Sequence, residues 1–421
     1  MSVTRRDAMR GGAAAIAGLA IGRLLGPQTA LAQAQAKARP LNLKITRLRI
    51  FLTEPRSIFV KVYTNQGLIG LGVSQQTGKE QTVAAAIMQN EPLLVGRDPT
   101  RIERIWEDLY EGPRWRGGPL TAAISAIDIA LWDILGQAVG QPIHVLMGGA
   151  VRDRIRVYQS AGGAMTPDRW AKLKGDGFTA ARIQWPRGTV PDMIAAVKDW
   201  RAAAGPGFEF AVHGAGTLPT SDAIRFMRGV EECDLMWVEE PIQMDDIEDW
   251  ALLRQHTSTP IATGERLLTK FAFNPLLTRH LIDFAQPDLA ACGGLTEARK
   301  IAAIAEANRI RIAPHGPQGP AGALANFHFD AVTPNFYIQE IRDYTNQADL
   351  DLHDGMVPVV KDGYCALPDR PGLGTVLNEK VAARRAYKQL GVTSGVGLSS
   401  GISARDAART TGDGAARSGG E

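Results

Sequence analysis

Cysteine is scarce in this chain, since only Cys233, Cys292 and Cys365 occur among its 421 residues. Three cysteines cannot form a closed disulfide framework, so we expect them to be small buried side chains. Apolar residues make up 45% of the chain and charged residues 22%, which is typical of a globular protein. A small fold held together by disulfides is therefore excluded.

Excess charge is nearly absent, because the formal net charge is only +3. The first 32 residues account for that excess, with Arg5, Arg6, Arg10 and Arg23 against a single acidic residue, Asp7. The remainder of the chain is close to neutral and leaves no basic surface for a phosphate backbone. We therefore expect no nucleic-acid partner.

A membrane-length apolar run is missing at the N-terminus, where the weakly apolar residues 11–25 are too few to span a bilayer. The arginine pair Arg5-Arg6 precedes this run and Ala30-Leu31-Ala32 follows it. That order is typical of a twin-arginine export signal, although a disordered N-terminus is the alternative. Residues 1–32 are predicted to be a leader cleaved near Ala32, which implies a periplasmic or exported protein without a membrane span.

Residues 41–150 predict a small α+β domain. Alternating apolar residues indicate strands over 45–51, 57–63 and 68–73, and Asn65-Gln66-Gly67 indicates a hairpin turn between the last two. Helical spacing of apolar residues follows over 79–90, 99–110 and 120–138.

Residues 151–345 show a different pattern, in which short apolar runs alternate with helical stretches. Eight such strand–helix repeats predict a (β/α)₈ barrel, whose active site lies at the carboxyl ends of the strands. The eight runs are Ile155–Ser160, Ala181–Trp185, Phe208–His213, Leu235–Glu239, Ile261–Glu265, Leu281–Asp288, Ile310–His315 and Phe336–Glu340.

The C-terminal part is turn-rich and extended over 346–388. Residues 391–421 contain no aromatic residue and are rich in small residues, so we expect a disordered tail there.

Four of the eight runs end in a carboxylate, and the first two of these are consecutive in the chain. Leu235-Met236-Trp237-Val238 continues into Glu239-Glu240, and Ile261-Ala262-Thr263 continues into Gly264-Glu265. Glu239 and Glu265 lie 26 residues apart, which is the length of one strand and one returning helix, so their strands are expected to be parallel neighbours. This predicts a divalent-cation site, while pairing of each acid with an arginine such as Arg266 is the alternative.

With these motifs in place, residues 42–388 resemble the enolase superfamily, in particular its mandelate racemase/muconate lactonizing enzyme-like branch. The motifs most resemble those of acid-sugar dehydratases of the galactonate type. The resemblance rests on these segments, all in order: Arg116–Pro119, Ala126–Asp133, Val238–Pro241, Ala262–Arg266, Gln286–Asp288, Gly293–Ala298, Ala313–His315, Gln339-Glu340 and Pro371–Gly374.

The resemblance implies an α/β fold: a modified (β/α)₈ TIM-like barrel with an α+β capping domain built from 41–150 and the returning segment 346–388. It implies one Mg²⁺ held by three strand-end ligands and a small-molecule carboxylate substrate, here a sugar acid. The implied reaction is removal of the proton alpha to the carboxylate, through an enediolate, by a metal-dependent lyase.

The resemblance also assigns roles to single residues. Glu239 and Glu265 match the second and third metal ligands. His315 matches the general base, and Asp288 matches the partner that orients its imidazole. Glu340 matches the acid that hydrogen-bonds the substrate carboxylate or its enediolate.

The third strand departs from the family pattern. Counted without a gap, His213 stands where the first metal-ligating Asp is expected and Ala215 where a catalytic His is expected. In a gapped alternative, His213 is the catalytic residue and Ala211 replaces the ligand. An imidazole with two carboxylates suits Mn²⁺, Fe²⁺ or Zn²⁺ better than Mg²⁺.

The second strand departs as well, because Arg182-Ile183-Gln184 replaces the Lys-x-Lys of racemases, so a base on the opposite face is missing. The leading hypothesis is therefore a hydro-lyase that removes the alpha proton and the beta hydroxyl of a sugar acid. The alternatives are an impaired sugar-acid-binding or regulatory protein, or another enolate-forming enzyme such as a racemase or cycloisomerase.

Specificity is expected to depend on capping-domain loops near Thr53–Ser57 and Arg114–Gly118. We also expect a symmetric homo-oligomer, since self-association is common.

Overall fold

The computed structural model describes residues 41–53, 57–162, 165–316, 318–342, 344 and 346–387. The predicted leader (1–32) and the predicted tail (391–421) lie outside the described residues. The described residues from Leu43 to Tyr387 belong to one compact unit. The separate domain boundaries predicted at 41–150, 151–345 and 346–388 therefore stay predictions.

The N-terminal part of this unit contains a three-stranded antiparallel sheet in the order β1-β2-β3. Its strands are β1 (Ile45–Thr53), β2 (Ser57–Thr64) and β3 (Ile69–Ser74). β3 lies directly against a helix, because a Cβ atom on Gly70 or Gly72 would overlap the backbone carbonyls of Ala130 or Ala126. Only glycine allows so close an approach between a strand and a helix.

Three helices complete this part: α2 (Glu80–Leu94), α3 (Ile102–Glu111) and α4 (Gly118–Val139). The helix expected over 99–110 begins three residues later than predicted. Asp98 explains the delay, because its side chain accepts a hydrogen bond from the backbone N–H of Thr100 at 2.9 Å and closes a turn ahead of the helix.

Helix α4 is the one helix in the described part of the chain that is long and apolar enough to cross a membrane. However, 72% of its most apolar window is buried inside the unit. Its residues Ile124, Ile127 and Leu131 are buried in the same apolar cluster as residues of β1, β2, α2 and α3. This is the behaviour of a core helix, whose apolar surface is covered by protein.

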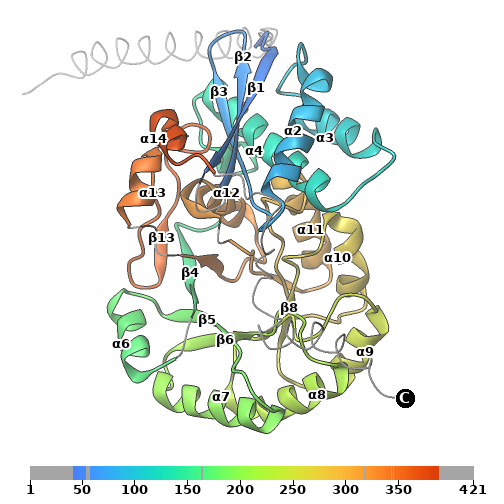
Figure 1. The fold of residues 1–421 in the computed structure, drawn as a ribbon, viewed down its shortest axis with the longest axis vertical. Coiled ribbons are helices and arrows are strands. Elements are labelled where there is room, and N and C mark those ends of the chain that lie inside the picture. Colours follow the sequence, from blue (N-terminus) through green and yellow to red (C-terminus); the bar gives the residue numbers. More distant parts are fainter. Residues whose placement is uncertain are drawn as a thin grey trace, which may run out of the picture. The chain divides into compact units, whose positions relative to one another are not determined.

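Eight parallel strands form the barrel, and each overlaps a predicted apolar run; β4, β5, β6 and β8 are labelled in Figure 1. They are β4 (Arg154–Ala161), β5 (Ala180–Gln184), β6 (Glu209–His213), β7 (Val238–Glu239), β8 (Ile261–Thr263), β9 (Phe284–Ala285), β10 (Arg311–Ile312) and β11 (Gln339–Ile341).

Strands β4 to β10 pair in chain order, and β11 pairs with β4. A parallel bridge between Ile312 and Phe336, just before β11, joins the two ends of the sheet. The backbone N–H of Tyr337 also donates to Ile312 O at 2.8 Å. The sheet therefore closes on itself, and the predicted barrel is confirmed.

The connections between barrel strands are helical. The helices are α6 (Pro167–Gly175), α7 (Val190–Ala204), α8 (Thr220–Gly229), α9 (Ile247–Gln255), α10 (Thr269–Thr278), α11 (Gly294–Ala307) and α12 (Gly319–Val332), with short α5 (Ile143–Leu146) before β4 and η1 (Glu231–Cys233) after α8. They cover the outside of the sheet, as in Figure 1 for α6 to α11.

The barrel interior holds a small apolar cluster of its own. It combines large residues with small ones: Tyr158, Ala180, Ala211, Met236, Trp237, Ala262, Phe284, Ala313 and Ile338. Because side chains alternate along a strand, the residue two positions further on points to the same side. Seven of these inward residues are followed in this way by a polar one: Ser160, Arg182, His213, Glu239, Gln286, His315 and Glu340. The strand period therefore gathers polar side chains at the carboxyl end of the barrel, above an apolar floor.

The C-terminal segment differs from the extended chain that the sequence predicted. It contains two short helices, α13 (Gln347–Leu352) and α14 (Glu379–Arg384), besides β12 (His353–Gly355), β13 (Tyr364–Ala366) and β14 (Thr375–Leu377). Asn346 and Asn378 cap the two helices, each accepting a backbone N–H three residues further on. These N-cap residues were the signal that the sequence analysis missed.

This segment returns to the N-terminal sheet, as expected. Glu379 accepts from Lys61 Nζ at 2.8 Å, and Tyr387 N–H donates to Leu52 O at 2.9 Å. β13 adds a contact that was not predicted, since it pairs antiparallel with barrel strand β4. The returning segment thus touches both the capping sheet and the barrel.

The capping elements dock on the loops that follow β9. Trp106 Nε1 donates to Gly293 O at 2.8 Å, and the Ser74 hydroxyl donates to Ala290 O at 2.8 Å. Asp128 accepts the N–H of Thr296 at 3.0 Å. These contacts place the cap at the carboxyl end of the strands, the same end as the polar side chains.

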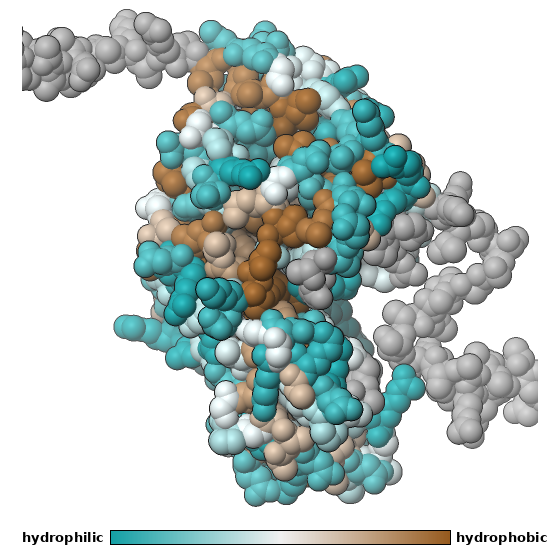
Figure 2. All heavy atoms as spheres, turned by 90° about the vertical axis from the view of Figure 1, so that its left-hand side faces the viewer, coloured by the Kyte–Doolittle hydropathy of each residue, from teal (hydrophilic) through white to brown (hydrophobic). Residues whose placement is uncertain are grey.

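Figure 2 shows one face of the molecule, on which hydrophobic side chains gather mainly in the upper and middle parts. In the C-terminal segment, Val359 and Val376 are more than half exposed. Exposed apolar side chains of this kind are found at self-association surfaces. The predicted homo-oligomer stays a prediction.

All three cysteines are free and buried, as the sequence predicted.

Candidate active site

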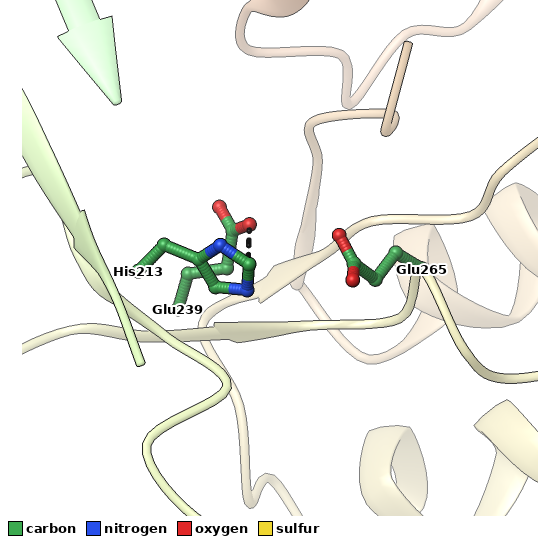
Figure 3. A group of neighbouring side chains, drawn as sticks. All are labelled: His213, Glu239 and Glu265. Carbon is green, nitrogen blue, oxygen red and sulfur yellow. Dashed lines mark ion pairs between the residues drawn. The ribbon is translucent and has the colours of Figure 1, made fainter. Parts of the chain in front are cut away.

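The three predicted metal ligands lie together at the carboxyl ends of neighbouring strands. His213 ends β6, Glu239 ends β7, and Glu265 follows β8 by two residues. One ligand atom from each lies within 4.8 Å of the other two. Figure 3 shows the three side chains converging from their separate strands. The three side chains are therefore close enough together to share one ion, and their role as metal ligands stays a prediction.

The register of β6 bears on the two alignments that the sequence left open. His213 pairs with Glu239 in the β6–β7 ladder and with Gln184 in the β5–β6 ladder. Its Nε2 lies 3.7 Å from Glu239 Oε1. His213 thus lies level with Glu239 and faces it. The ungapped alignment places His213 in this way, at the position of the first metal ligand.

Glu239 is held in one orientation by neutral donors. Its Oε2 accepts hydrogen bonds from Gln286 Nε2 at 2.8 Å and from Trp237 Nε1 at 3.2 Å. Its Oε1 faces His213 Nε2 and lies 3.3 Å from Arg182 Nε. Because the side chain is almost fully buried, these partners offset the cost of removing its charge from water.

His315 is oriented by Asp288. The two residues form a parallel bridge after β9 and β10, and Asp288 Oδ2 lies 2.7 Å from His315 Nδ1. A carboxylate at that distance accepts the Nδ1 proton, which leaves Nε2 facing the site. Nε2 lies 3.2 Å from Glu265 Oε2 and 3.8 Å from Glu340 Oε2.

The charges around His315 have a large effect on its basicity. Burial by itself lowers the pKa of the imidazole, but the negative charges of Glu265, Glu340 and Asp288 outweigh it and raise that pKa to about 10. Burial also raises the pKa of Glu265, against the opposing effect of His315. The imidazole therefore holds its proton strongly while these carboxylates are ionised, and a cation on Glu265 weakens that hold.

Glu340, in β11, is fully buried and ionised. Burial raises the pKa of this carboxyl group. Arg182 and His315 have a larger, opposite effect, so the pKa falls to about 2. Arg182 Nη2 lies 3.0 Å from Glu340 Oε1, and the N–H of Gly316 donates to Oε2 at 3.2 Å. An ionised carboxylate accepts hydrogen bonds and cannot donate them.

Glu240 forms a second charged group beside the cluster. Arg266 donates to it through Nε at 3.1 Å and contacts it through Nη2 at 2.7 Å. Its Oε2 lies 3.6 Å from His213 Nε2, and its backbone has φ 45°, a left-handed conformation that is uncommon outside glycine. Of the arginine pairing considered as the alternative, Arg266 thus pairs with Glu240, while Arg182 contacts Glu239.

The donor set fits a divalent cation. Two ligands about 2.1 Å from one ion lie at most about 4.2 Å apart, so the observed spread of up to 4.8 Å needs side-chain shifts of less than an ångström. Both ring nitrogens of His213 are buried, and neither has a hydrogen-bond partner among the described residues. A buried imidazole nitrogen in that state is available to a metal ion.

Sequence reasoning found His213, Glu239, Glu265, Asp288 and His315 and placed them at one end of the barrel. It also found Glu340, which lies beside His315.

Sequence reasoning missed the roles of Arg182, Gln286 and Trp237, which contact the predicted site directly. The signal for Arg182 and Gln286 was available, because each stands two residues after an inward-facing apolar residue on its strand.

The two predicted specificity loops are placed only in part. Residues 54–56 of the first lie outside the described residues. In the second, Arg116 forms an ion pair with Glu111 and lies over the ring of Tyr110, while Trp115 is 77% exposed. Tyr110 stacks on Phe271 of α10, the helix that follows Glu265, so this loop lies on the site's side of the barrel.

A closed barrel with a cap over its carboxyl end and an imidazole facing a carboxylate cluster defines a class of barrel enzymes that work on carboxylate substrates with a metal ion. Comparison with known families agrees. The family model Enolase C-terminal domain-like matches residues 167–381, and the model Mandelate racemase / muconate lactonizing enzyme, N-terminal domain, matches residues 28–148. The chain belongs to the mandelate racemase/muconate lactonizing enzyme family of the enolase superfamily.

Individual relatives are similar along most of their length. A D-galactonate dehydratase from Ralstonia nicotianae is 36% identical over 369 residues, covering 82% of this chain and 94% of the relative. A D-galactonate dehydratase family member from Streptomyces bingchenggensis is 34% identical over 400 residues, covering 82% and 93%. The solved structure of an enolase from Pantoea ananatis with bound D-gluconate and Mg has a TM-score of 0.77 and 32% identity, covering 82% of this chain and 95% of that one.

Proposed function

We propose that this protein is a metal-dependent dehydratase of sugar acids, that is, a carbon–oxygen lyase of the hydro-lyase type. The observation that carries the proposal is the His315–Asp288 pair, joined at 2.7 Å and facing the cluster of His213, Glu239 and Glu265. The dehydratase names of relatives at 34–36% identity support this reaction class.

His213, Glu239 and Glu265 would hold the divalent cation. When bound, it would neutralise the negative charge that develops on the substrate carboxylate as the alpha proton leaves. The relative from Pantoea ananatis contains Mg. An imidazole ligand favours Mn²⁺, Fe²⁺ or Zn²⁺ in this chain, because these ions accept nitrogen donors more readily than Mg²⁺ does.

His315 is placed to move the proton. With Nδ1–H bonded to Asp288, Nε2 is the atom that takes the alpha proton from the substrate carbon. The same Nε2–H then returns that proton to the departing beta hydroxyl, which leaves as water. The resulting enol becomes a 2-keto-3-deoxy acid. One residue suffices only if both groups leave from the same face.

Two neighbours would position the substrate. Glu340 is an anion that accepts hydrogen bonds, so hydroxyl groups of a sugar acid suit it better than a second carboxylate does. Arg182 holds Glu340 in place through Nη2 at 3.0 Å. Polyhydroxylated acids are thus favoured over simple ones.

Other reactions of the family fit less well. Racemisation and epimerisation need a base on each face, and β5 offers Arg182 and Gln184 where racemases carry lysines. A binding protein without turnover would keep Glu239 and Glu265 but would not need the orienting contact between Asp288 and His315. The relatives' names do not favour that alternative.

The test is a product assay. Purified protein supplied with Mn²⁺, Mg²⁺ or Zn²⁺ and a panel of aldonic and uronic acids, including D-galactonate and D-gluconate, should form 2-keto-3-deoxy acids that react with semicarbazide. His315→Asn should abolish product formation, while His256→Gln, a control at an exposed histidine after α9, should retain it. An inactive wild-type protein across the panel would refute the proposal.

The location and assembly of the protein also remain proposals. We propose that residues 1–32 direct it to the periplasm, on the basis of Arg5-Arg6 and the sequence around Ala32. We propose a homo-oligomer, supported by the exposed apolar side chains of Val359 and Val376. Fractionation and light scattering test these two proposals separately.

A further inference from the structure

Arg182 crosses the inside of the barrel beside the predicted metal cluster. It lies on β5, between Ser160 of β4 and Ala211 of β6 in the strand ladders, and its side chain is only 12% exposed. Its Nε lies 3.3 Å from Glu239 Oε1, and its Nη2 lies 3.0 Å from Glu340 Oε1. One guanidinium therefore joins a candidate metal ligand to the acid on β11.

The positive charge of Arg182 is permanent. Burial lowers the pKa of the guanidinium, but Glu340 and Glu239 more than reverse that effect, so its pKa stays above its already high ordinary value. A buried arginine is tolerated only when carboxylates compensate it. The site thus contains a fixed cation in addition to any metal ion that it binds.

Glu239 is the residue that this fixed cation shares with the cluster. Its Oε2 is occupied by the donors of Trp237 and Gln286. Its Oε1 is the oxygen that faces both Arg182 and His213. A metal ion on Oε1 and the guanidinium of Arg182 therefore compete for the charge of a single oxygen.

Arg182 reduces the negative charge that the three ligands offer to a cation. Glu239 and Glu265 supply two negative charges and His213 supplies none, while Arg182 lies 3.3 Å from Glu239 Oε1. Glu340 compensates part of the charge of Arg182 through its contact with Nη2 at 3.0 Å, and Glu240, beside His213, is paired with Arg266. The carboxylate of an acid substrate would add negative charge next to the cation.

We propose that Arg182 couples metal binding to acid binding, by weakening the hold of His213, Glu239 and Glu265 on a divalent cation until a carboxylate ligand enters the site. This inference rests on the proposed function, since it assumes the same metal and the same class of ligand. Arg182 acts through Glu239 and Glu340 and is therefore a positioning residue. Because coupling between two ligands is reciprocal, the metal tightens acid binding by the same factor.

Calorimetric titration of the metal-free full-length protein with Mn²⁺, with and without an excess of D-gluconate, tests the coupling. In the wild type, D-gluconate should tighten the Kd for Mn²⁺ by at least about tenfold. In Arg182→Gln, Mn²⁺ alone should bind at least about tenfold more tightly than in the wild type, and the effect of D-gluconate should shrink.

Two further variants separate charge from structure. Arg182→Lys keeps the positive charge and should behave like the wild type toward Mn²⁺. His213→Asp restores a carboxylate without changing Arg182, so it should tighten Mn²⁺ binding and reduce the coupling even if Arg182→Gln does not fold. Arg156→Gln serves as the matched control, because Arg156 is a half-buried arginine paired with Glu209 at the opposite end of the strands.

The outcomes are distinguishable from those of the dehydratase assay. A wild-type Kd for Mn²⁺ that is unchanged by D-gluconate overturns the inference, as does an unchanged Kd in both Arg182→Gln and His213→Asp. Absence of Mn²⁺ binding under every condition overturns both this inference and the proposed metal site. Clear coupling in a protein that forms no keto acid would support the inference and refute the proposed reaction.

Discussion

A buried histidine pair away from the active site makes a quantitative prediction about stability. His328 of α12 is fully buried, and its Nδ1 lies 3.2 Å from His144 Nδ1 and 3.3 Å from the backbone N of His144. Its Nε2 lies 3.2 Å from Leu373 O. Neutral His328 satisfies this arrangement, with Nε2–H donating to Leu373 and Nδ1 accepting the N–H of His144.

Protonation of His328 would place a second proton on Nδ1, where it would face the backbone N–H of His144. Burial, and then the neighbouring His144, lower the pKa of His328 from 6.5 to about 3. In the unfolded chain the imidazole takes up a proton near its ordinary pKa. The contribution of His328 to stability is therefore complete above pH 6.5 and is lost as the pH falls toward 3.

The magnitude follows from linkage. Each pH unit between the two pKa values is worth about 1.4 kcal/mol, so lowering the pH from 6.5 to 4.5 should remove about 2–3 kcal/mol through His328. The pH dependence of the wild-type free energy of unfolding will not show this contribution by itself. Burial raises the pKa of Asp128 to about 7 and that of Asp133 to about 6, and such acids stabilise the fold as the pH falls.

A comparison with His328→Gln isolates the contribution. At pH 7.5 the variant should be less stable than the wild type, because the acceptor for His144 N–H is lost, at a cost of about 1–3 kcal/mol. At pH 4.5 the variant should regain about 2–3 kcal/mol relative to the wild type. Urea unfolding followed by circular dichroism at both pH values measures the difference.

The control for this comparison is His256→Gln, at an exposed histidine after α9, which should change the free energy of unfolding by less than about 0.5 kcal/mol at either pH. If the free energies of unfolding of the wild type and His328→Gln differ by the same amount at pH 7.5 and pH 4.5, the reasoning is refuted. Such a result would mean that His328 is protonated to the same extent in the folded and unfolded chain.

Three more predictions concern other parts of the molecule. Asp288→Asn should lower kcat by at least about a hundredfold while leaving the Kd for Mn²⁺ within about threefold of the wild type; a parallel loss of both would point to a structural role. Gly294→Ala should lower the melting temperature, because the new methyl group would overlap Asp128 and because Gly294 has φ 81°, and an unchanged melting curve would contradict this. Replacing Arg5 and Arg6 together by lysine should retain the precursor in the cytoplasm, as seen by fractionation and immunoblotting, whereas normal export would exclude a twin-arginine signal.

In the capping sheet and the barrel, the nature of the main elements and their order could be predicted from the sequence alone, whereas the short helices of the C-terminal segment were missed. Apolar periodicity located the strands and helices, and the residues that close the barrel strands, such as Glu239 and His315, could be read at the ends of those runs. This worked because strand and helix periods are local properties, and because parallel strands joined by helices bring their carboxyl ends to one edge.

The tertiary structure alone decided which charged groups meet across the barrel. Arg266 pairs with Glu240, and Arg182 bridges Glu239 and Glu340, whose strands are far apart in the chain. No local pattern specifies such contacts, since they depend on barrel closure and on the side-chain layer that each strand contributes. Closure brings β11 beside β4, and this juxtaposition determines which carboxylates share the guanidinium of Arg182.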